Sequence, residues 1–345
     1  MFSFKWGFRF MQKEFLSLPS RIIIALFVIG LILLPLFTQD PYILRIFTLA
    51  CIFAIFAASW DFLAGYVGQI SFGHALFFGI GAYSTAILNL RLDLPHWMTI
   101  VLGAVVAVVA GLLVGFPALR LKGPYLGLVT LAFPVMLTGI IFLFPDFTGG
   151  ELGISGIARL ASTRQQEYYI AVIVMITLIT VLWKITVSKY GIIFHAIRED
   201  EIAVRASGIN TVRYKLTAFC LSGFYAGVAG GLYAHYLRIA GPGLLDILMS
   251  FQVIIWTILG GIATIYGPVV GVFVLYPLLE YMRVVPQYRM LLFTIIVLLL
   301  VHFMPEGIAN WVRDMLEKEC PRCKERNVFT RRECRYCYAQ IATKK

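Results

Sequence analysis

The segment Ser188–Lys215, SKYGIIFHAIREDEIAVRASGINTVRYK, is the longest charged interval in the chain, and strongly apolar runs lie on both sides of it. Within this segment, Asp200 can cap the N-terminus of a short helix over Glu201–Ser207. Gly208 can then supply the left-handed residue that commonly follows a helix. We therefore predict a helix of about two turns in the middle of the interval.

This short helix has two different faces. Ile202, Ala203 and Ala206 share a small apolar face, while Glu201 and Arg205 form an i,i+4 pair on another face. A helix of about two turns is not stable alone in water, so we expect it to pack against its own chain or against a partner. An ordinary amphipathic connector would show the same pattern, and the segment alone does not distinguish a connector from a docking element.

The composition of the whole chain is that of a membrane protein. Hydrophobic residues make up 60% of the 345 residues, charged residues 14%, and the mean hydropathy is +0.86. A soluble domain carries about 25% charged residues, and a membrane-spanning helix needs about 20 mostly apolar residues. The sequence predicts an all-α polytopic membrane protein with about ten transmembrane helices, some short or broken by glycine. The predicted spans are Arg21–Phe37, Ile43–Ala64, Ile70–Leu90, Trp97–Phe116, Pro124–Phe144, Tyr168–Val187, Leu216–Leu237, Leu248–Ile265, Pro268–Met282 and Arg289–Met304.

The basic residues predict an orientation for these spans. With the N-terminus in the cytoplasm, 22 of the 29 Lys and Arg residues lie on the cytoplasmic side, as the positive-inside rule requires. Both termini are then cytoplasmic, and the chain is a multi-pass protein of the cell (plasma) membrane. Residues 1–20 mix aromatic and basic residues and suit an interfacial segment on the inner leaflet, although a disordered basic tail would look the same.

Two glycine-interrupted stretches are candidates for a translocation path. The first carries Gln69, Ser71 and His74 in an otherwise apolar segment, where polar atoms are costly unless they face protein or water. The second, Leu259–Phe273, contains three further candidates, Gly260, Gly261 and Gly267. Broken helices in corresponding places of two halves indicate a transport path, whereas close helix packing would explain the glycines equally well.

Several classes of function lack a sequence signal. The charged residues inside the predicted spans are Arg45, Asp61 and Glu280, all near span ends, where a charge can reach the membrane interface. No carboxylate pair indicates a proton relay, and the phosphate-binding motif G-x-x-x-x-G-K-[ST] is absent. We therefore predict that the chain is not an enzyme and that ATP-driven work would need another chain.

The C-terminal region predicts a metal site. After the last span, apolar residues recur at helical spacing over 306–319, which predicts an amphipathic juxtamembrane helix. The tail 320–345 contains two CxxC pairs, and four thiolates at this spacing can hold a tetrahedral structural zinc ion. Iron in a rubredoxin-like site is the alternative. The tail is also basic, which favours lipid or protein as its contact and makes nucleic acid unlikely. The predicted ligands are Cys320, Cys323, Cys334 and Cys337.

With these residues in view, the chain from Phe2 to Ala309 resembles the permeases of branched-chain amino-acid ABC importers, specifically the LivM-like half. The stretches that carry the resemblance occur in the family's order: Gly65–Leu88 (GYVGQISFGHALFFGIGAYSTAIL), Lys122–Phe133 (KGPYLGLVTLAF), Thr148–Ile157 (TGGELGISGI), Ser188–Tyr233 and Leu259–Val272 (LGGIATIYGPVVGV). Two features depart from the family: Asp61, where such permeases commonly have a neutral amide, and the cysteine-rich tail.

The resemblance implies an all-α permease that works with a second homologous permease, two cytoplasmic ATPases and an extracytoplasmic solute-binding protein. Segment 188–215 would be the loop that couples ATPase closure to the spans within a permease domain of residues 21–305. The path residues named above would lie near the translocated solute. The residues that the resemblance assigns to ATPase coupling are Arg198, Glu199, Glu201, Ile202, Ala203, Arg205, Ala206 and Gly208.

The function expected from these observations is that of a permease subunit of an ATP-driven importer of branched-chain amino acids. Urea, short amides or a sugar are alternative solutes within the same superfamily. A stand-alone secondary transporter or channel, and a membrane-tethered zinc-ribbon adaptor, are alternatives from other classes.

Overall fold

The computed structural model describes residues 19–118, 124–304, 306–320, 322–323, 326–328, 337 and 340. Almost all of the predicted interfacial segment 1–20 therefore lies outside the described residues. The helices are α2 (Pro19–Phe37), α3 (Pro41–Asp61), the π-helix η1 (Phe62–Tyr66), α4 (Ala75–Leu92), α5 (His96–Ala118), α6 (Pro124–Leu143), α7 (Pro145–Thr148), η2 (Gly150–Leu152), α8 (Arg164–Val187), α9 (Lys189–Glu199), α10 (Glu201–Ala206), α11 (Thr211–Leu237), η3 (Pro242–Leu245), α12 (Ile247–Gly260), α13 (Tyr266–Tyr281), η4 (Met282–Val284), α14 (Arg289–Phe303) and α15 (Ile308–Leu316).

Two small antiparallel pairs of strands complete the described fold. Strand β1 (Ile154–Ser155) pairs with β2 (Ile239–Ala240), and β3 (Glu317–Glu319) pairs with β4 (Arg326–Val328). The first pair joins the loop after α7 to the end of α11. The second pair follows α15, and Cys320 and Cys323 lie between its two strands.

The helices confirm the predicted all-α polytopic fold. Among the described residues, eight helices are long and apolar enough to cross a membrane, and the apolar helices Ile22–Phe37 and Ile247–Gly260 are shorter. Each of the ten predicted spans overlaps one of the helices. Helix α4 begins five residues later than predicted, at Ala75, because the preceding residues form an irregular connection. Helix α12 ends at Gly260 because Gly261 and Ala263 adopt positive φ angles of 125° and 60°.

Helix α3 is the centre of the bundle. Every residue from Thr48 to Val67 is buried, and α3 packs against α8, α11, α12 and α13. A helix that is apolar on all sides is expected in such a central position. Asp61 is part of this buried run and is fully inaccessible. The expectation that its charge reaches the membrane interface is therefore wrong, because the chain continues as η1 beyond it.

Glycines allow the central helices to approach at backbone distance. A Cβ atom at Gly230 of α11 would collide with the carbonyl oxygen of Phe78 in α4, and one at Gly81 would collide with the backbone of Gly227. Such small-residue contacts are the usual way in which membrane helices pack closely. The core is therefore held by α3, α4, α5 and α11.

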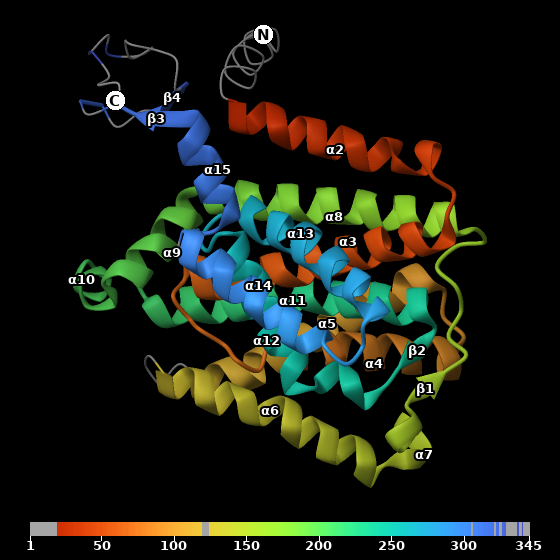
Figure 1. Cartoon of the computed structure of the whole chain (residues 1–345). Helices are drawn as coiled ribbons and strands as arrows, with labels where there is room; N and C mark the ends of the chain where they lie inside the picture. Colours follow the sequence, from red (N-terminus) through yellow and green to blue (C-terminus); the bar gives the residue numbers. More distant parts are fainter. Residues whose placement is uncertain are drawn as a thin grey trace, which may run out of the picture.

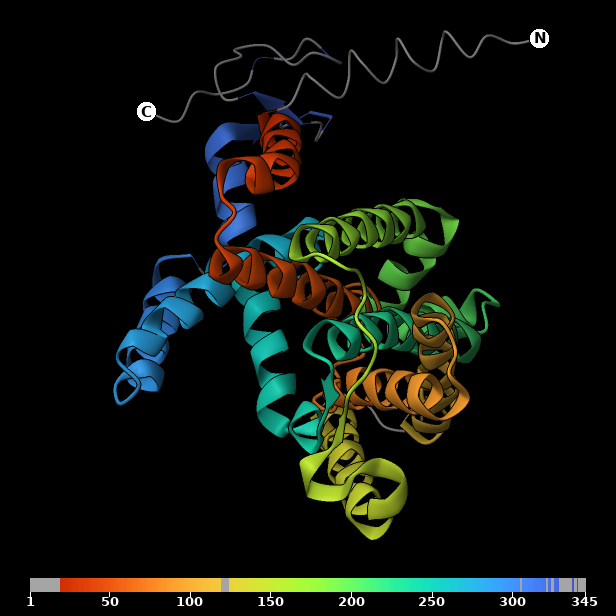
Figure 2. The same ribbon diagram turned by 90° about the vertical axis from the view of Figure 1, so that its right-hand side faces the viewer.

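Figure 1 shows how the other elements are arranged around this core. Helices α9 and α10 project at one end of the bundle, where α2 begins and α15 lies, while α7, β1 and β2 lie at the opposite end. Helix α6 lies at the edge of the bundle in both views (Figures 1 and 2), and α14, which crosses the front of the bundle in Figure 1, lies at its edge in Figure 2. The charged segment Ser188–Lys215 thus forms a projection at one end of an apolar bundle.

Candidate functional site

Helix α9 packs onto the end of the central helix. The Ser188 hydroxyl caps α9 by accepting a hydrogen bond from the Tyr190 amide at 3.2 Å. Phe194 is buried and meets the ring of Phe62 edge-on, with the ring centroids 5.3 Å apart. The His195 ring lies 4.8 Å from the Tyr66 ring. Aromatic packing therefore fixes α9 against η1.

Arg198 extends this contact to the backbone of η1. Its Nη1 group donates a hydrogen bond to the carbonyl oxygen of Gly65. Its side chain lies over Gly68, where a Cβ atom would be 3.2 Å from the Arg198 Cγ atom and where φ is +74°. The last carbonyl groups of a helix lack hydrogen-bond partners within the helix and carry a partial negative charge. A guanidinium group can donate a hydrogen bond to such a carbonyl and also offset its charge. Arg198, although exposed, thus reaches from α9 to the η1 segment that follows α3.

Asp61 connects the end of α3 to the segment between α12 and α13. Its Oδ1 atom accepts a hydrogen bond from the amide of Ala263 at 2.7 Å. A Cβ atom at Gly65 would collide with the Asp61 carboxylate and with the Ala263 amide, so glycine is required there. The Asp61 Oδ2 atom is buried and has no hydrogen-bond partner among the described residues. Elements α3, η1, α9 and the α12–α13 connection therefore meet around one polar cluster.

Helix α10 confirms the short helix predicted from the sequence. It spans Glu201–Ala206, and the Asp200 carboxylate caps it by accepting hydrogen bonds from the Ile202 and Ala203 amides at 2.8 and 3.1 Å. Gly208 follows the helix with a φ of +82°. The capping residue and the glycine thus have the roles that their positions predicted.

The inner side of α10 is held by a charged pair and one apolar residue. Glu201 Oε2 pairs with the Nζ atom of Lys215 at 2.6 Å, and Glu201 Oε1 pairs with Arg205 at 2.8 Å. Lys215 is buried, as is Val204. Partial burial raises the pKa of Glu201, but hydrogen bonds from Lys215, Thr211 and Arg205 outweigh it and leave the pKa below its ordinary value.

The outer side of α10 is exposed. Ile202 is 73% exposed, and Ala203 and Ala206 are exposed beside it. The apolar face predicted from the sequence is therefore not covered by the described part of the chain. Of the residues assigned to coupling, Glu201 turns partly inward, and Arg198 contacts η1 although it is exposed. The others are also exposed: Glu199, Ile202, Ala203, Arg205, Ala206 and Gly208.

The first group of predicted path residues lies in the connection between η1 and α4. His74 is buried, its Nε2 atom lies 2.8 Å from the Ser59 hydroxyl, and its ring stacks on Phe56 with centroids 5.3 Å apart. The Ser71 carbonyl accepts a hydrogen bond from the Trp60 indole at 2.7 Å, and Gln69 is buried. These side chains are packed within the bundle, and their place beside a path stays a prediction.

The second group of predicted path residues packs α12 against α13. A Cβ atom at Gly260 would collide with the carbonyl oxygen of Gly267, and one at Gly267 would collide with that of Gly261. Close packing of α12 against α13 therefore requires Gly260 and Gly267. This is the helix-packing interpretation of the glycine-rich sequence. A role beside the path stays a prediction.

Three of the four predicted metal ligands lie together: Cys320 and Cys323 come between β3 and β4, and Cys337 follows β4. The Sγ atoms of Cys320, Cys323 and Cys337 are all within 4.8 Å of one another, and the Cys320 and Cys337 sulfurs are 3.5 Å apart. Hydrogen bonds from the backbone of Cys323 and Arg322 lower the pKa of the Cys320 thiol, which favours the thiolate form. Cys334 lies outside the described residues. The described thiols are compatible with a metal site.

Some residues of the site were not identified as functional from the sequence. The roles of Asp61, Gly65, Gly68 and Lys215 depend on contacts between segments far apart in the chain. The one available signal was Asp61, a charged residue in an otherwise apolar segment. Intramembrane charges of this kind indicate a specific interaction.

The Glu201–Lys215 pair predicts a pH dependence. Because the pKa of Glu201 is lowered by folding, the pair stabilises the protein above the ordinary glutamate pKa of about 4.3. This contribution is lost as the pH falls through the lower pKa of the folded state. We expect the melting temperature of the purified wild type to fall more between about pH 6 and about pH 3 than that of Glu201→Gln. The exposed-site variant Glu199→Gln serves as the control and should follow the wild type. Equal pH dependence in all three proteins would contradict the role of the pair.

Comparisons with known proteins agree with this architecture. Residues 42–301 match the family model described as branched-chain amino acid transport system / permease component. The chain is 29% identical over 306 residues to the high-affinity branched-chain amino acid transport system permease protein LivM of Salmonella typhimurium, covering 80% of this chain and 72% of the relative. The corresponding LivM protein of Escherichia coli is 29% identical over 78% of this chain and 70% of the relative. A probable LivM protein of Methanocaldococcus jannaschii is 25% identical over 68% of this chain and 77% of the relative.

These relatives are permease proteins and not enzymes, in agreement with the prediction that this chain has no catalytic activity of its own. No solved structure is significantly similar to the chain. The family model covers most of the chain and nearly all of its helical bundle. The chain therefore belongs to the family of permease components of branched-chain amino acid transport systems.

Proposed function

We propose that this protein is the membrane permease subunit of an ATP-driven importer that carries branched-chain amino acids across the cell (plasma) membrane. The observation that carries the proposal is the match to the permease family over residues 42–301. The three relatives named above support the solute class, because each is named as a branched-chain amino acid permease. ATP hydrolysis would be performed by separate chains.

The orientation follows from the distribution of charge. We infer that both termini and the α9–α10 projection lie in the cytoplasm, because 22 of the 29 Lys and Arg residues then lie on the cytoplasmic side. The start of α2, helix α15 and the α9–α10 projection lie at the same end of the bundle (Figure 1), which is consistent with this orientation.

The α9–α10 projection is the proposed docking element for a cytoplasmic ATPase. Its outer face offers Ile202 and two alanines in an exposed apolar patch, with charged residues around them. Burial of such a patch in a groove of the ATPase would stabilise the complex by about 25 cal/mol for each Å² of apolar surface removed from water. The inner face is fixed to α11 by the Glu201–Lys215 pair, and α10 also packs directly against α9, so a displacement of α10 would carry α9 with it.

Arg198 is the proposed link from the projection to the path. A shift of α9 would move the Gly65 carbonyl that Arg198 holds and the adjoining Gly68. Residues Gln69, Ser71 and His74 follow directly in the chain and are part of the proposed path. The second proposed part is the glycine contact of Gly260, Gly261 and Gly267. It adjoins Ala263, which Asp61 binds.

The complete importer would contain further proteins. We infer a second homologous permease, two cytoplasmic ATPase subunits and an extracytoplasmic solute-binding protein as partners of this chain. The loop that contains α7, β1 and β2 lies at the end of the bundle opposite the α9–α10 projection (Figure 1). The solute-binding protein would approach from that end if α9 and α10 are cytoplasmic.

The described thiols fit a zinc ion. Zinc binds thiolates at about 2.3 Å in a tetrahedron, which places the sulfur atoms about 3.8 Å apart. The 3.5 Å separation of the Cys320 and Cys337 sulfurs is close to this value. We propose that Cys320, Cys323 and Cys337 bind a structural zinc ion together with Cys334. The ion would hold the tail together, because about 25 residues cannot form a core of their own.

Ile202→Asp tests the docking role of α10. The substitution places a charge on an exposed apolar position, so we expect the permease to reach the membrane and to bind less ATPase, because a buried carboxylate without a partner is costly. The measurement is the amount of ATPase that copurifies with the permease. The control is Leu152→Asp, at an 87% exposed position at the opposite end of the bundle, which should retain the ATPase. Full ATPase retention by Ile202→Asp would rule out docking through this face.

Cys320→Ser tests the metal site. Loss of one thiolate from four should abolish tight binding, so elemental analysis of the purified protein is expected to find about one zinc per wild-type chain and far less in the variant. Cys220→Ser, in helix α11 and far from the tail in sequence, should retain the metal. An unchanged metal content in Cys320→Ser would show that the proposed set of ligands is wrong.

A further inference from the structure

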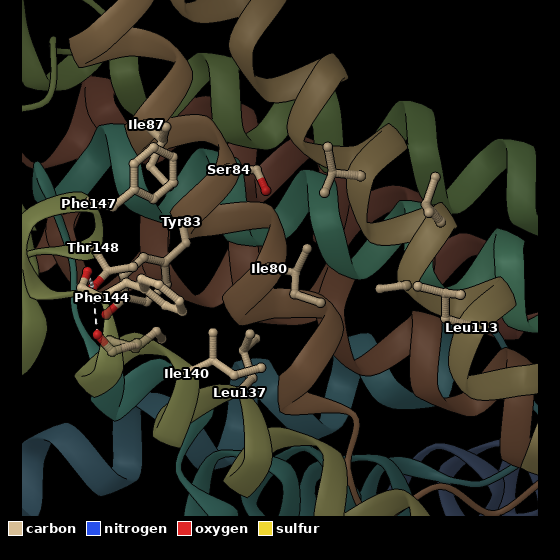
Figure 3. Close-up of a pocket in the computed structure, with 14 residues that line it drawn as sticks. Ile80, Tyr83, Ser84, Ile87, Leu113, Leu137, Ile140, Phe144, Phe147 and Thr148 are labelled. Carbon is tan, nitrogen blue, oxygen red and sulfur yellow. Dashed lines mark hydrogen bonds between the residues drawn. The ribbon is translucent and has the colours of Figure 1, made fainter.

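A cavity of about 600 Å³ lies between α4, α5, α6 and α7, and neither the α9–α10 projection nor the proposed path residues contribute to its lining. In Figure 3, Ile80 and Tyr83 of α4 lie on one side of this space, and Leu137 and Ile140 of α6 lie on the other. Helix α5 contributes Val109 and Leu113. We refer to this cavity as the α5–α6 groove.

The lining of the α5–α6 groove is almost entirely apolar. The polar groups are the hydroxyls of Tyr83, Ser84 and Thr148, and no charged side chain of the described residues lines it. The Thr148 hydroxyl is already engaged with the Ile141 carbonyl oxygen at 2.7 Å. Tyr83 is only 6% exposed, and its hydroxyl has no hydrogen-bond partner among the described residues. Among the described residues, no carboxylate lines the groove to pair with the ammonium group of a free amino acid, so such a solute would be a poor ligand.

The position of the groove in the fold indicates which medium surrounds it. Three of the helices that form it, α4, α5 and α6, are among those long and apolar enough to cross a membrane. Helix α6 lies at the edge of the bundle (Figures 1 and 2), and much of its surface is exposed. An apolar cavity of this size is not filled well by water, whereas it does accept apolar molecules. The adjacent apolar medium is the lipid bilayer, so an acyl chain is the natural occupant.

The side chain of Arg91 lies at one end of the groove, the end that α7 forms. The Arg91 Nη2 group donates a hydrogen bond to the carbonyl oxygen of Asp146 at 2.7 Å, and the Arg91 Cζ atom lies 4.4 Å from the centroid of the Phe147 ring. Phe147 itself lines the groove. Arg91 is exposed, and a guanidinium group has five N–H donors, so this one can also bind a phosphate. The apolar lining with a cation at one end thus matches a phospholipid, in which a phosphate lies at one end of the apolar acyl chains.

We propose that the α5–α6 groove binds one phospholipid of the leaflet on the α7 side. One acyl chain occupies the groove, and the headgroup phosphate contacts Arg91. The acyl chain fills the space that the edge helix α6 leaves beside α4 and α5. The lipid would therefore act as a structural filler between α6 and the rest of the bundle.

Photo-crosslinking after purification in mild detergent, which removes most of the bulk bilayer lipid, tests the occupant. A photoreactive amino acid at Val109, which lines the groove, is expected to crosslink retained phospholipid in protein purified from cells whose lipids carry radioactive phosphate. The same residue at Val105 provides a matched control. It lies on the same helix and is 48% exposed against 50% for Val109, but it does not line the groove. We expect strong radiolabel at position 109 and little at position 105. Equal label at both positions, or a crosslink from 109 to a second permease subunit, would overturn the proposal.

Two substitutions test the two ends of the site in the purified importer complex. Val109→Trp should fill the groove, so native mass spectrometry should show loss of the retained phospholipid, whereas Val105→Trp should retain it. Arg91→Gln should reduce the radiolabel at position 109 if the guanidinium holds the phosphate. Retention of lipid by Val109→Trp would contradict acyl-chain binding, and unchanged label in Arg91→Gln would contradict the headgroup contact.

Discussion

The hydrogen bond from Arg198 to the Gly65 carbonyl oxygen connects the charged projection to the centre of the bundle. Helix α3 is buried along most of its length and ends inside the protein, where its last carbonyl groups have no water to bind. A guanidinium group from α9 satisfies one of them, and the amide of Gln69 satisfies the Leu63 carbonyl at 3.0 Å. The same end of α3 carries Asp61, which binds the α12–α13 connection. The need to pair these buried polar groups therefore brings three distant segments of the chain together.

The two sides of the α9–α10 projection serve different purposes in the proposed mechanism. The inner side is fixed by the aromatic pair Phe194 and Phe62 and by the ion pair of Glu201 with buried Lys215. The outer side presents Ile202 without a cover from the described part of the chain. Rigid attachment on one side and exposure on the other are what a docking element needs to pass on a displacement. The π-helix η1 lies at the point of attachment, and such helices often occur at functional sites.

Local patterns in the sequence were sufficient for the helices and for α10. Apolar runs of the required length predicted each span, and the order Asp200, short helix, Gly208 predicted the observed cap and C-terminal turn. The direction of Arg198 and the burial of Asp61 could not be predicted in this way, because both depend on which segment packs against the end of α3. The function of the glycines at 260, 261 and 267 could not be predicted from the sequence either, because close helix packing and a transport path both favour glycine. The α5–α6 groove has no local signal, because it arises from the separation of α6 from its neighbours.

The most direct test of the central claim is the ratio of solute uptake to ATP hydrolysis in proteoliposomes that contain the complete importer. Arg198→Gln removes the guanidinium group from the Gly65 carbonyl and leaves the exposed face of α10 intact. The exposed residue Arg213 lies in the same charged segment, and Arg213→Gln is the matched control. The account predicts that Arg198→Gln still binds the ATPase but transports less solute for each ATP hydrolysed, while Arg213→Gln keeps the wild-type ratio. A wild-type ratio in Arg198→Gln would contradict the claim that this contact transmits the motion.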